Sequence, residues 1–381
     1  MRGVKETKFK NTEIGQIPEN WEVKKLGAVF DIGNGRDYKH LNTGKIPVYG
    51  TGGLMTYVNE YLYDGETVCI GRKGTINMPQ YHNGKIWTVD TLFYTYNFRK
   101  TDVKFLYYLT QRIDWNSYNT ATGVPSLTSQ NISNILVSFP PLHEQHRIAS
   151  ALTSIDNLIS SLGKLIEKKK NIKQGAMQQL LTGKTRLKGF NEPWMEKKLG
   201  DIGSLAMCKR IFQEETSEKG DVPFYKIGTF GQQADAYITK GKYEQFKQMY
   251  RFPQKGDVLI SAAGTIGRTV IYNGEPAYFQ DSNIVWLAHN GKYITNNFLF
   301  YIYQRTDWNT EDTTIARLYN NNFNNTCIHF PSSITEQQAI ANILSKMDNE
   351  ITALETKKAK YEAIKQGMMQ QLLIGKIRLI S

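Results

Sequence analysis

The stretch KQGAMQQLLTGKTRL occupies residues 173–187, and the stretch KQGMMQQLLIGKIRL occupies residues 365–379. The two differ only at Ala176/Met368, Thr182/Ile374 and Thr185/Ile377. A repeat this close indicates a duplicated physical role, and therefore a chain built from two related halves.

A long helix is predicted to lead into each copy of this stretch. Apolar residues recur there at alternating spacings of four and three, which is typical of a coiled-coil seam, although an amphipathic helix on a globular core is the alternative. Each helix would have about 40 residues and a length of about 60 Å. The first set comprises Ile148, Leu152, Ile155, Ile159, Leu162 and Ile166, and the second Ile340, Leu344, Met347, Ile351 and Leu354.

Several residues predict how these helices begin, end and pack. Gly183 and Gly375 follow the helical pattern where a left-handed C-cap is expected. Residues 333–336, SITE, have the form of a capping box. Gly175 and Gly367 lie inside the helices, where glycine costs about 1 kcal/mol against alanine. They indicate either a kink or the close approach of another backbone.

A segment of about 140 residues precedes each helix, and the two segments share landmarks. Residues 21–27, WEVKKLG, match residues 194–200, WMEKKLG. Short runs rich in Tyr, Phe, Val, Ile, Thr and Gly indicate mixed α/β domains with many strands. Because the termini of a domain usually lie close together, the second helix should run back along the first.

The predicted fold is therefore α+β. Two homologous mixed α/β domains are separated by a long antiparallel two-helix coiled coil, with a pseudo-twofold relation. The predicted boundaries are 1–141 for the first domain, 142–186 for the first helix, 187–332 for the second domain and 333–381 for the second helix.

The amino-acid composition indicates which kinds of partner and which cellular environment suit this chain. Lys and Arg number 47 against 35 Asp and Glu, a net charge of +12. This excess favours a polyanion, with nucleic acid ahead of an anionic membrane, although a basic protein without such a partner is the alternative. Three distant cysteines form neither a disulfide framework nor a CxxC pair, which predicts a reducing cytoplasm. There is no apolar run of 18 residues to predict a membrane span.

Motifs for catalysis and metal binding are weak. Residues 182–185, TGKT, resemble the end of a phosphate-binding loop, but Gln178 stands where the first glycine is required. His143 and His146 have no histidine counterparts in the second copy, so a helix surface explains them better than a metal site. We therefore predict no catalytic and no metal-binding residues.

Glycine-rich turns carry cationic and amide side chains that suit DNA. Glycine lets the backbone approach phosphate, arginine can read guanine, and asparagine or glutamine can read adenine. Each turn alone is also compatible with an ordinary β-turn. The candidate DNA-binding residues are Arg36, Tyr38, Lys39, Thr51, Arg72, Lys73, Thr122 and Ser126 in the first domain, and Arg210, Thr229, Gln232, Arg268, Arg317, Tyr319 and Asn320 in the second.

With two domains alternating with two repeated helices, the chain resembles the specificity subunit of Type I restriction-modification systems. Phrases that carry the resemblance include residues 46–52, IPVYGTG, residues 70–75, IGRKGT, and residues 139–145, FPPLHEQ, together with the QQLLxGK endings. The resemblance covers the whole chain. It implies a noncatalytic subunit that reads a bipartite duplex DNA target, one half-site per domain, with the helix pair setting the gap between the halves.

The resemblance also implies partners. Two methyltransferase subunits would dock on this chain and, through them, restriction/translocase subunits. Those partners would use S-adenosylmethionine, ATP and Mg²⁺, with no cofactor in this chain. The copied helix ends would offer two equivalent docking sites, at Gln178, Leu180, Leu181, Gln370, Leu372 and Leu373. A self-contained DNA methyltransferase or nuclease, and a stand-alone architectural or regulatory DNA-binding protein, are the alternatives.

Overall fold

The computed structural model describes residues 8–308 and 317–379. It divides into two compact units, unit 1 with Met1–Lys164 and Glu355–Ser381, and unit 2 with Leu165–Leu354. Each unit contains one globular domain and one segment of each long helix. We call the part of unit 1 before the first long helix domain 1, and the part of unit 2 between the two long helices domain 2.

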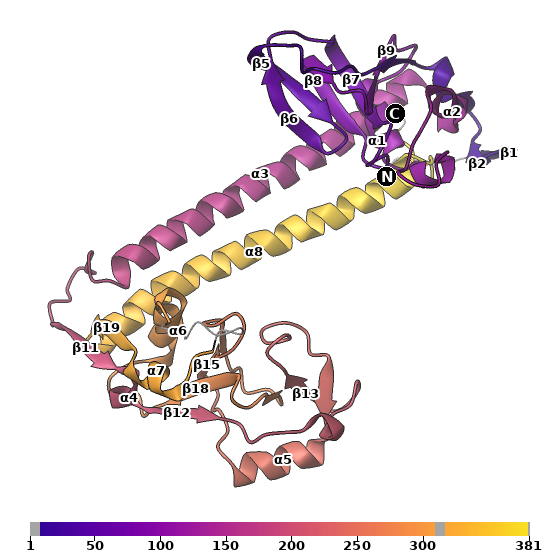
Figure 1. The fold of residues 1–381 in the computed structure, drawn as a ribbon. Coiled ribbons are helices and arrows are strands. Elements are labelled where there is room, and N and C mark those ends of the chain that lie inside the picture. The colour runs from indigo at the N-terminus through magenta and orange to yellow at the C-terminus, as the bar shows by residue number, and fades with distance from the viewer. Residues whose placement is uncertain (1–7, 309–316, 380–381) are drawn as a thin grey trace, which may run out of the picture. The chain divides into compact units, whose positions relative to one another are not determined.

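Domain 1 is built around a six-stranded sheet with the order β4-β9-β7-β8-β5-β6 (Figure 1). Domain 1 also contains two separate two-stranded sheets, β1-β2 and β3-β10. The elements are β1(Phe9–Thr12), β2(Gly15–Pro18), β3(Glu22–Lys25), η1(Leu26–Ala28), β4(Asp31–Asn34), β5(Thr43–Gly50), β6(Gly53–Val58), β7(Tyr63–Gly71), β8(Gln80–Thr88), β9(Leu92–Tyr96), α1(Val103–Thr110), η2(Trp115–Tyr118), α2(Ser129–Asn134) and β10(Leu136–Phe139).

Domain 2 divides its strands between a four-stranded sheet, β12-β18-β15-β16, and a three-stranded sheet, β14-β13-β17, with β11-β19 as a separate pair. The elements are β11(Trp194–Lys198), α4(Leu199–Ile202), β12(Ser204–Met207), η3(Gln213–Glu215), β13(Val222–Tyr225), β14(Ala236–Ile238), α5(Lys240–Met249), β15(Val258–Ser261), β16(Thr269–Ile271), β17(Tyr278–Phe279), β18(Ile284–Ala288), α6(Asn296–Arg305), α7(Asn320–Asn325) and β19(Cys327–Pro331).

The same strand pairing recurs in both domains, as the sequence landmarks predict. In domain 1, β5 pairs in parallel with β8 and antiparallel with β6, with Tyr49 opposite Thr88. In domain 2, β13 pairs in parallel with β17 and antiparallel with β14, with Tyr225 opposite Phe279. Residues 47–49, PVY, match residues 223–225, PFY, so Tyr49 and Tyr225 are equivalent and the homology of the two domains extends to their hydrogen-bonding register.

The two long helices are α3(Leu142–Leu180) and α8(Ile334–Leu372), of 39 residues each. Gly183 and Gly375, beyond their ends, have φ angles of 70° and 71°. The left-handed C-caps predicted from the sequence are therefore confirmed. No described atom lies within 4 Å of a Cβ built on Gly175 or Gly367, so these glycines are not explained by a close approach within the described chain.

Within each unit, the segments of α3 and α8 run antiparallel and are joined by equivalent ion pairs. In unit 1, Lys365 Nζ lies 2.7 Å from Asp156 Oδ1. In unit 2, Lys173 Nζ lies 2.5 Å from Asp348 Oδ1. A tyrosine hydroxyl donates to the second oxygen of each aspartate, from Tyr108 to Asp156 and from Tyr301 to Asp348. The helix repeat is thus also a repeat of contacts between each helix pair and its domain.

A buried glutamate holds the end of one helix against the beginning of the other in each unit. In unit 1, the Arg378 guanidinium binds both oxygens of Glu144 at 2.6 Å, and Trp21 Nε1 also donates to Glu144. In unit 2, Arg186 binds both oxygens of Glu336 at 2.7 Å. Both glutamates are fully buried. Because an isolated buried carboxylate is very costly, each glutamate requires its arginine.

The capping box predicted at residues 333–336 is wrong. The Glu336 carboxylate binds Arg186 instead of turning back to Ser333, and the Ser333 hydroxyl lies 2.8 Å from Thr335 Oγ1. An ion pair with a residue 150 positions away therefore replaces the local cap.

We predict that Arg378→Ala lowers the free energy of unfolding of unit 1 by about 3–5 kcal/mol, because it leaves Glu144 buried without its cation. Arg186→Ala should cost less, because the Arg186 side chain is 29% exposed against 7% for Arg378. Urea unfolding followed by circular dichroism measures both losses. Lys358→Ala, which removes an exposed pair with Glu362, is the control and should cost about 0.3–0.5 kcal/mol. If Arg378→Ala lowered the free energy of unfolding no more than Lys358→Ala does, Glu144 would not require Arg378.

Candidate nucleic-acid interface

The turn between β8 and β9 is the point at which the loops of domain 1 meet. The Arg36 backbone N–H donates to the Thr88 carbonyl at 2.8 Å, and Val89 N–H donates to the Tyr49 carbonyl at 3.0 Å. Arg72 N–H donates to the Thr91 carbonyl at 2.8 Å. Three loops from different parts of the sequence are thereby fixed to one turn.

The loop of residues 119–127 joins this group through the loop that follows β7. Gly74 N–H donates to the Pro125 carbonyl at 2.9 Å, and Lys73 forms a β-bridge with Ser126. Asn119 Oδ1 accepts from the Ser126 backbone at 2.8 Å, which closes the loop on itself. The structure thus brings together the loops that carry all eight candidates of domain 1, Arg36, Tyr38, Lys39, Thr51, Arg72, Lys73, Thr122 and Ser126.

Basic side chains on these loops are accessible. Arg36, Lys39, Arg72 and Lys73 are all exposed. Arg72 Nη1 lies 3.3 Å from the Asp90 carbonyl, a long and weak contact that leaves most of its donors free. A hollow of about 700 Å³ opens between the loops, and Tyr38, Lys39, Thr51 and Asp90 contribute to its lining. The arrangement can present donors, acceptors and positive charge to a polyanion.

Uncharged groups hold the tip of the β5–β6 hairpin. Gln80 Nε2 donates to the carbonyls of Gly50 and Thr51 at 2.9 and 3.3 Å. His82 Nε2 lies 3.2 Å from Gln80 Oε1, and its ring lies 3.8 Å from that of Tyr49 between centroids. Burial lowers the pKa of His82 to about 4, so the imidazole is neutral near pH 7. Sequence reasoning missed Gln80, because nothing local links it to a turn about thirty residues earlier.

The loops of domain 2 are linked in a similar way, but largely by side chains. Arg210 Nε binds Asp281 Oδ2 at 2.8 Å, and Gln280 Oε1 accepts from the Ile227 backbone at 2.9 Å. Arg268 Nη1 donates to the Phe230 carbonyl at 2.9 Å. Two predicted DNA-binding arginines, Arg210 and Arg268, therefore also hold the loops in place.

The remaining candidates of domain 2 join the group through backbone contacts. Ala263 forms a β-bridge with Arg317, and the adjacent Leu318 N–H donates to the Ala262 carbonyl at 2.9 Å. Arg317, Tyr319, Asn320 and Gln232 are exposed. The Thr229 hydroxyl, in contrast, accepts from the Lys226 backbone at 3.1 Å and stabilises its own turn.

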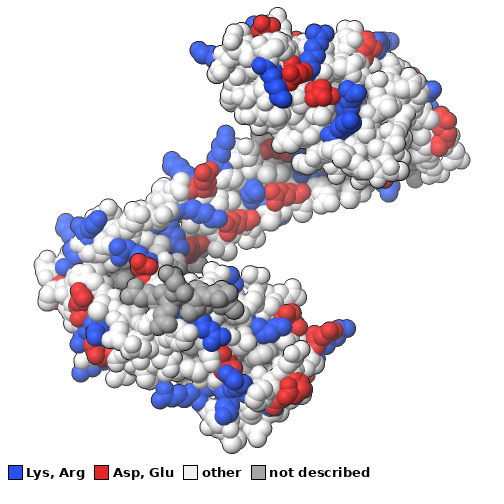
Figure 2. Space-filling model, viewed as in Figure 1, with Lys and Arg blue, Asp and Glu red and all other residues white. Residues whose placement is uncertain are grey.

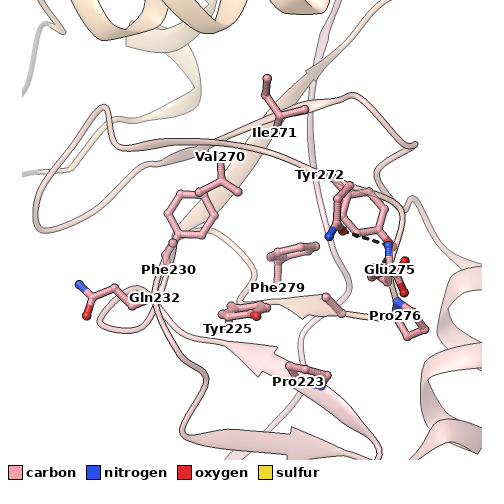
Figure 3. A pocket seen from close by; sticks show the side chains of 13 residues that line it. Pro223, Tyr225, Phe230, Gln232, Val270, Ile271, Tyr272, Glu275, Pro276 and Phe279 are labelled. Carbon is pink, nitrogen blue, oxygen red and sulfur yellow. Dashed lines mark hydrogen bonds between the residues drawn. The ribbon is translucent and has the colours of Figure 1, made fainter. Parts of the chain in front are cut away.

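Domain 2 also has an aromatic hollow of about 390 Å³ beside these loops (Figure 3). The rings of Tyr225 and Phe279 are stacked in it, with centroids 5.8 Å apart and planes at 17°. Phe230 and Val270 lie at one side, and the exposed Gln232 amide stands at the rim. The hollow offers a flat apolar surface next to a hydrogen-bonding group.

Figure 2 shows Lys and Arg interspersed with Asp and Glu on the visible face of domain 1 and along the helices. Several of these neighbours are ion pairs, such as Lys169 with Glu350. On this face, the net positive charge is not gathered into one basic patch. The loops that carry the DNA-binding candidates of domain 1 supply positive charge from a few exposed side chains, such as Arg36, Lys39 and Arg72.

The predicted partner-binding set needs correction. Leu180 and Leu181 are buried in the core of unit 2, and Leu372 and Leu373 are buried in the core of unit 1. These four leucines fasten each helix end to a domain, so their side chains are not available to a partner in this structure. Gln178 and Gln370 are exposed. The repeat located these leucines at both helix ends, but the sequence could not indicate what would cover them.

Among the described residues, no group of three or more His, Cys, Asp or Glu side chains is placed to hold a metal ion. No helix within residues 8–308 and 317–379 has the length and apolar character required to cross a membrane.

The doubled construction agrees with a known family. The sequence model described as "Type I restriction modification DNA specificity domain" matches twice, at residues 18–174 and 191–366. The chain therefore belongs to the type I restriction-modification DNA specificity family, as a specificity subunit with two copies of the domain. The alternatives of a self-contained methyltransferase or nuclease and of a stand-alone DNA-binding protein are not favoured.

Relatives with similar sequences extend over most of the chain. A putative type I restriction enzyme specificity subunit of Haemophilus influenzae is 36% identical, with 86% of this chain and 88% of the relative covered. The type I restriction enzyme MjaVIII specificity subunit of Methanocaldococcus jannaschii is 25% identical, with 99% and 98% covered.

A solved structure supports the fold. The S subunit of a type I restriction-modification system from M. genitalium has a TM-score of 0.67 at 16% identity, with 93% of this chain and 96% of that chain covered. This similarity confirms that the chain has the fold of an S subunit.

We predict different consequences for substitution of Arg72, in the loop after β7, and of Arg268, in the loop after β15. Arg72→Ala should weaken DNA binding with little change in thermal stability, because Arg72 is exposed and its side chain makes only a long hydrogen bond to the Asp90 carbonyl and a contact 5.8 Å from the centre of the Phe93 ring. Arg268→Ala should weaken binding and lower stability, because its guanidinium holds the Phe230 carbonyl. A base contact should lose about 1–3 kcal/mol of discrimination at one position, whereas a phosphate contact should weaken all sequences alike.

Fluorescence anisotropy on a panel of duplexes, paired with thermal melts, measures these effects. Lys85→Ala is the matched control, because it removes one exposed positive charge that lies over Tyr61, away from the loops. If Arg72→Ala bound DNA like the control variant, the loop after β7 would not contact DNA.

Proposed function

We propose that each domain reads one half of a bipartite duplex DNA target, and that the chain itself carries out no chemistry. The observation that supports this most directly is the common strand register of the two domains combined with different side chains on their loops. A shared frame presents both sets of loops in the same way. Diverged loop residues suit two different base sequences.

Methylation and cleavage would then belong to partner subunits. Two methyltransferase subunits would bind this chain, and restriction/translocase subunits would join through them. S-adenosylmethionine, ATP and Mg²⁺ would be used by those partners. The long helices would fix the number of base pairs between the half-sites. Positive charge on the loops would make DNA binding strongly dependent on salt concentration.

Exposed residues that are identical at the two helix ends support two equivalent docking sites. Packing explains why the buried leucines are copied, but it does not explain the copied and exposed glutamines. Around the end of α3 lies a hollow of about 440 Å³, to which Gln174, Gln178 and Arg305 contribute. The open surroundings of Gly175 would let a partner backbone approach the helix closely. The exposed equivalents of Gln174 and Gln178 on α8 are Gln366 and Gln370.

A domain exchange tests the division of labour between domains. Residues 187–332 are replaced by the matching domain of a related protein, and both helices are kept. We expect the methylated sequence to change in one half only, because the loops of domain 1 are untouched. Methylome sequencing of cells that carry the exchange reads this out. A folded, active assembly that changed both half-sites, or neither, would refute the proposal.

Steric block of the helix ends tests the docking sites. Gly175→Trp should reduce the number of bound methyltransferase subunits from two to one, and Gly175→Trp with Gly367→Trp should reduce it to none. The fold should tolerate both changes, since the surroundings of these glycines are open. Native mass spectrometry gives the stoichiometry. Ala353→Trp, at another exposed position on α8, is the control and should retain both subunits. Two bound subunits in the double variant would show that docking occurs elsewhere.

A further inference from the structure

Large apolar side chains are unusually exposed on the loops of domain 1 that carry the DNA-binding candidates. Among the described residues of domain 1, five such side chains are more than half exposed, and four of them lie on or beside the loops that meet at the β8–β9 turn. Single exposed apolar residues are ordinary, but a group on one functional face indicates a binding surface. The four are Leu54 at 51%, Met55 at 54%, Met78 at 63% and Val124 at 64%, and the fifth is Tyr61.

Leu54 and Met55 are held in place by their surroundings. They follow the hairpin tip, whose Gly50 and Thr51 carbonyls are bound by Gln80. Met55 Sδ lies 2.7 Å from the position that a Cβ would take on Gly50, so the Met55 side chain packs over the Gly50 backbone and a Cβ there would displace it. We call the exposed side chains of Leu54 and Met55 the apolar rim.

The apolar rim lines a hollow together with polar and basic groups. Lys39, Thr51 and Asp90 contribute to the same hollow of about 700 Å³. Arg36, Arg72 and Lys73 are exposed on the adjoining loops. Positive charge around the hollow suits a polyanion, and the apolar rim must then meet an apolar feature of that polyanion.

In the major groove of DNA, that apolar feature is the 5-methyl group of thymine. An alternative is a wedge inserted between base pairs, which requires a protruding apolar tip. Leu54 and Met55 instead line a concave surface, which can receive a protruding methyl group. The geometry therefore favours contact with a thymine edge over intercalation.

Domain 2 lacks this arrangement at the matching hairpin. The connection between β13(Val222–Tyr225) and β14(Ala236–Ile238) is longer and carries the exposed amides of Gln232 and Gln233. Amide side chains suit the hydrogen-bonding edge of adenine. The two hairpins thus differ in chemistry as well as in sequence.

We propose that the half-site read by domain 1 contains a thymine whose 5-methyl group packs against Leu54 and Met55. This inference rests on the proposed function, because it requires domain 1 to read base edges. It names the kind of base and the two side chains that recognise it.

Replacing thymine by deoxyuridine removes only the methyl group and tests the contact directly. With the target known from methylome sequencing, each thymine of the domain 1 half-site is replaced in turn, and the binding of the complete methyltransferase assembly is measured. At one thymine we expect a loss of affinity of about three- to fivefold, as for burial of one methyl group. The double variant Leu54→Ala/Met55→Ala should bind the thymine and deoxyuridine duplexes equally.

Two further variants sharpen the test. Gly50→Ala displaces Met55 without altering its side chain, and should reduce the preference for thymine. Tyr61→Ala, which alters an exposed ring beyond the opposite end of β6, should leave the preference intact. Thermal melts check that all variants fold.

Three outcomes would overturn the inference. The domain 1 half-site could prove insensitive to every deoxyuridine, or the preference could persist in the double variant. The double variant could also lose its methyltransferase subunits, which would assign the apolar rim to a protein interface. An assembly that still methylates a bipartite target in these cases would leave the proposed function standing. Failure of the wild-type assembly to recognise any specific target would count against the proposed function itself.

Discussion

A buried carboxylate paired with a distant arginine holds each unit together. Glu144 begins the first long helix, and its partner Arg378 lies beyond the end of the second. Glu336 and Arg186 repeat this relation in the other unit. Because a buried carboxylate without its cation is strongly destabilising, neither unit is complete without a helix end that is remote in sequence. The tertiary structure thus depends on interactions that tie the start of one helix to the end of the other.

This dependence explains part of the duplicated sequence. Leu372 and Leu373 complete the core of unit 1, and Leu180 and Leu181 complete that of unit 2. Two related cores require two related helix ends, so the leucines, the capping glycines and the arginines are copied. The exposed glutamines have no such role in packing. Their identity fits the proposal that the same partner surface is met twice.

The two domains share the same strand pairing but differ in the residues of their loops. Parallel pairing of β5 with β8, and of β13 with β17, fixes where each hairpin leaves its sheet. Loop side chains then differ without disturbing that pairing. In domain 1 the loops are joined mainly through backbone hydrogen bonds, which leaves Arg36 and Arg72 largely free. In domain 2, Arg210 and Arg268 take part in holding the loops, so substitutions there carry a greater structural cost.

The sequence by itself determined the elements that depend on neighbouring residues. Apolar spacing and the glycines at 183 and 375 located both long helices and their left-handed caps, and matching landmarks such as Tyr49 and Tyr225 established the homology of the domains. The family resemblance followed from the same repeat. These features could be predicted because helical periodicity and capping are governed by residues only a few positions apart.

Only the tertiary structure decided which distant groups meet. It showed that Glu336 binds Arg186 instead of capping its own helix, that the repeated leucines are core residues, and that Gln80 fixes the hairpin tip. It also revealed Leu54 and Met55 as exposed, since an apolar strand sequence gives no sign that its strand lies at the edge of a sheet. Contacts of this kind depend on topology, because residues remote in sequence become neighbours only when the chain has folded.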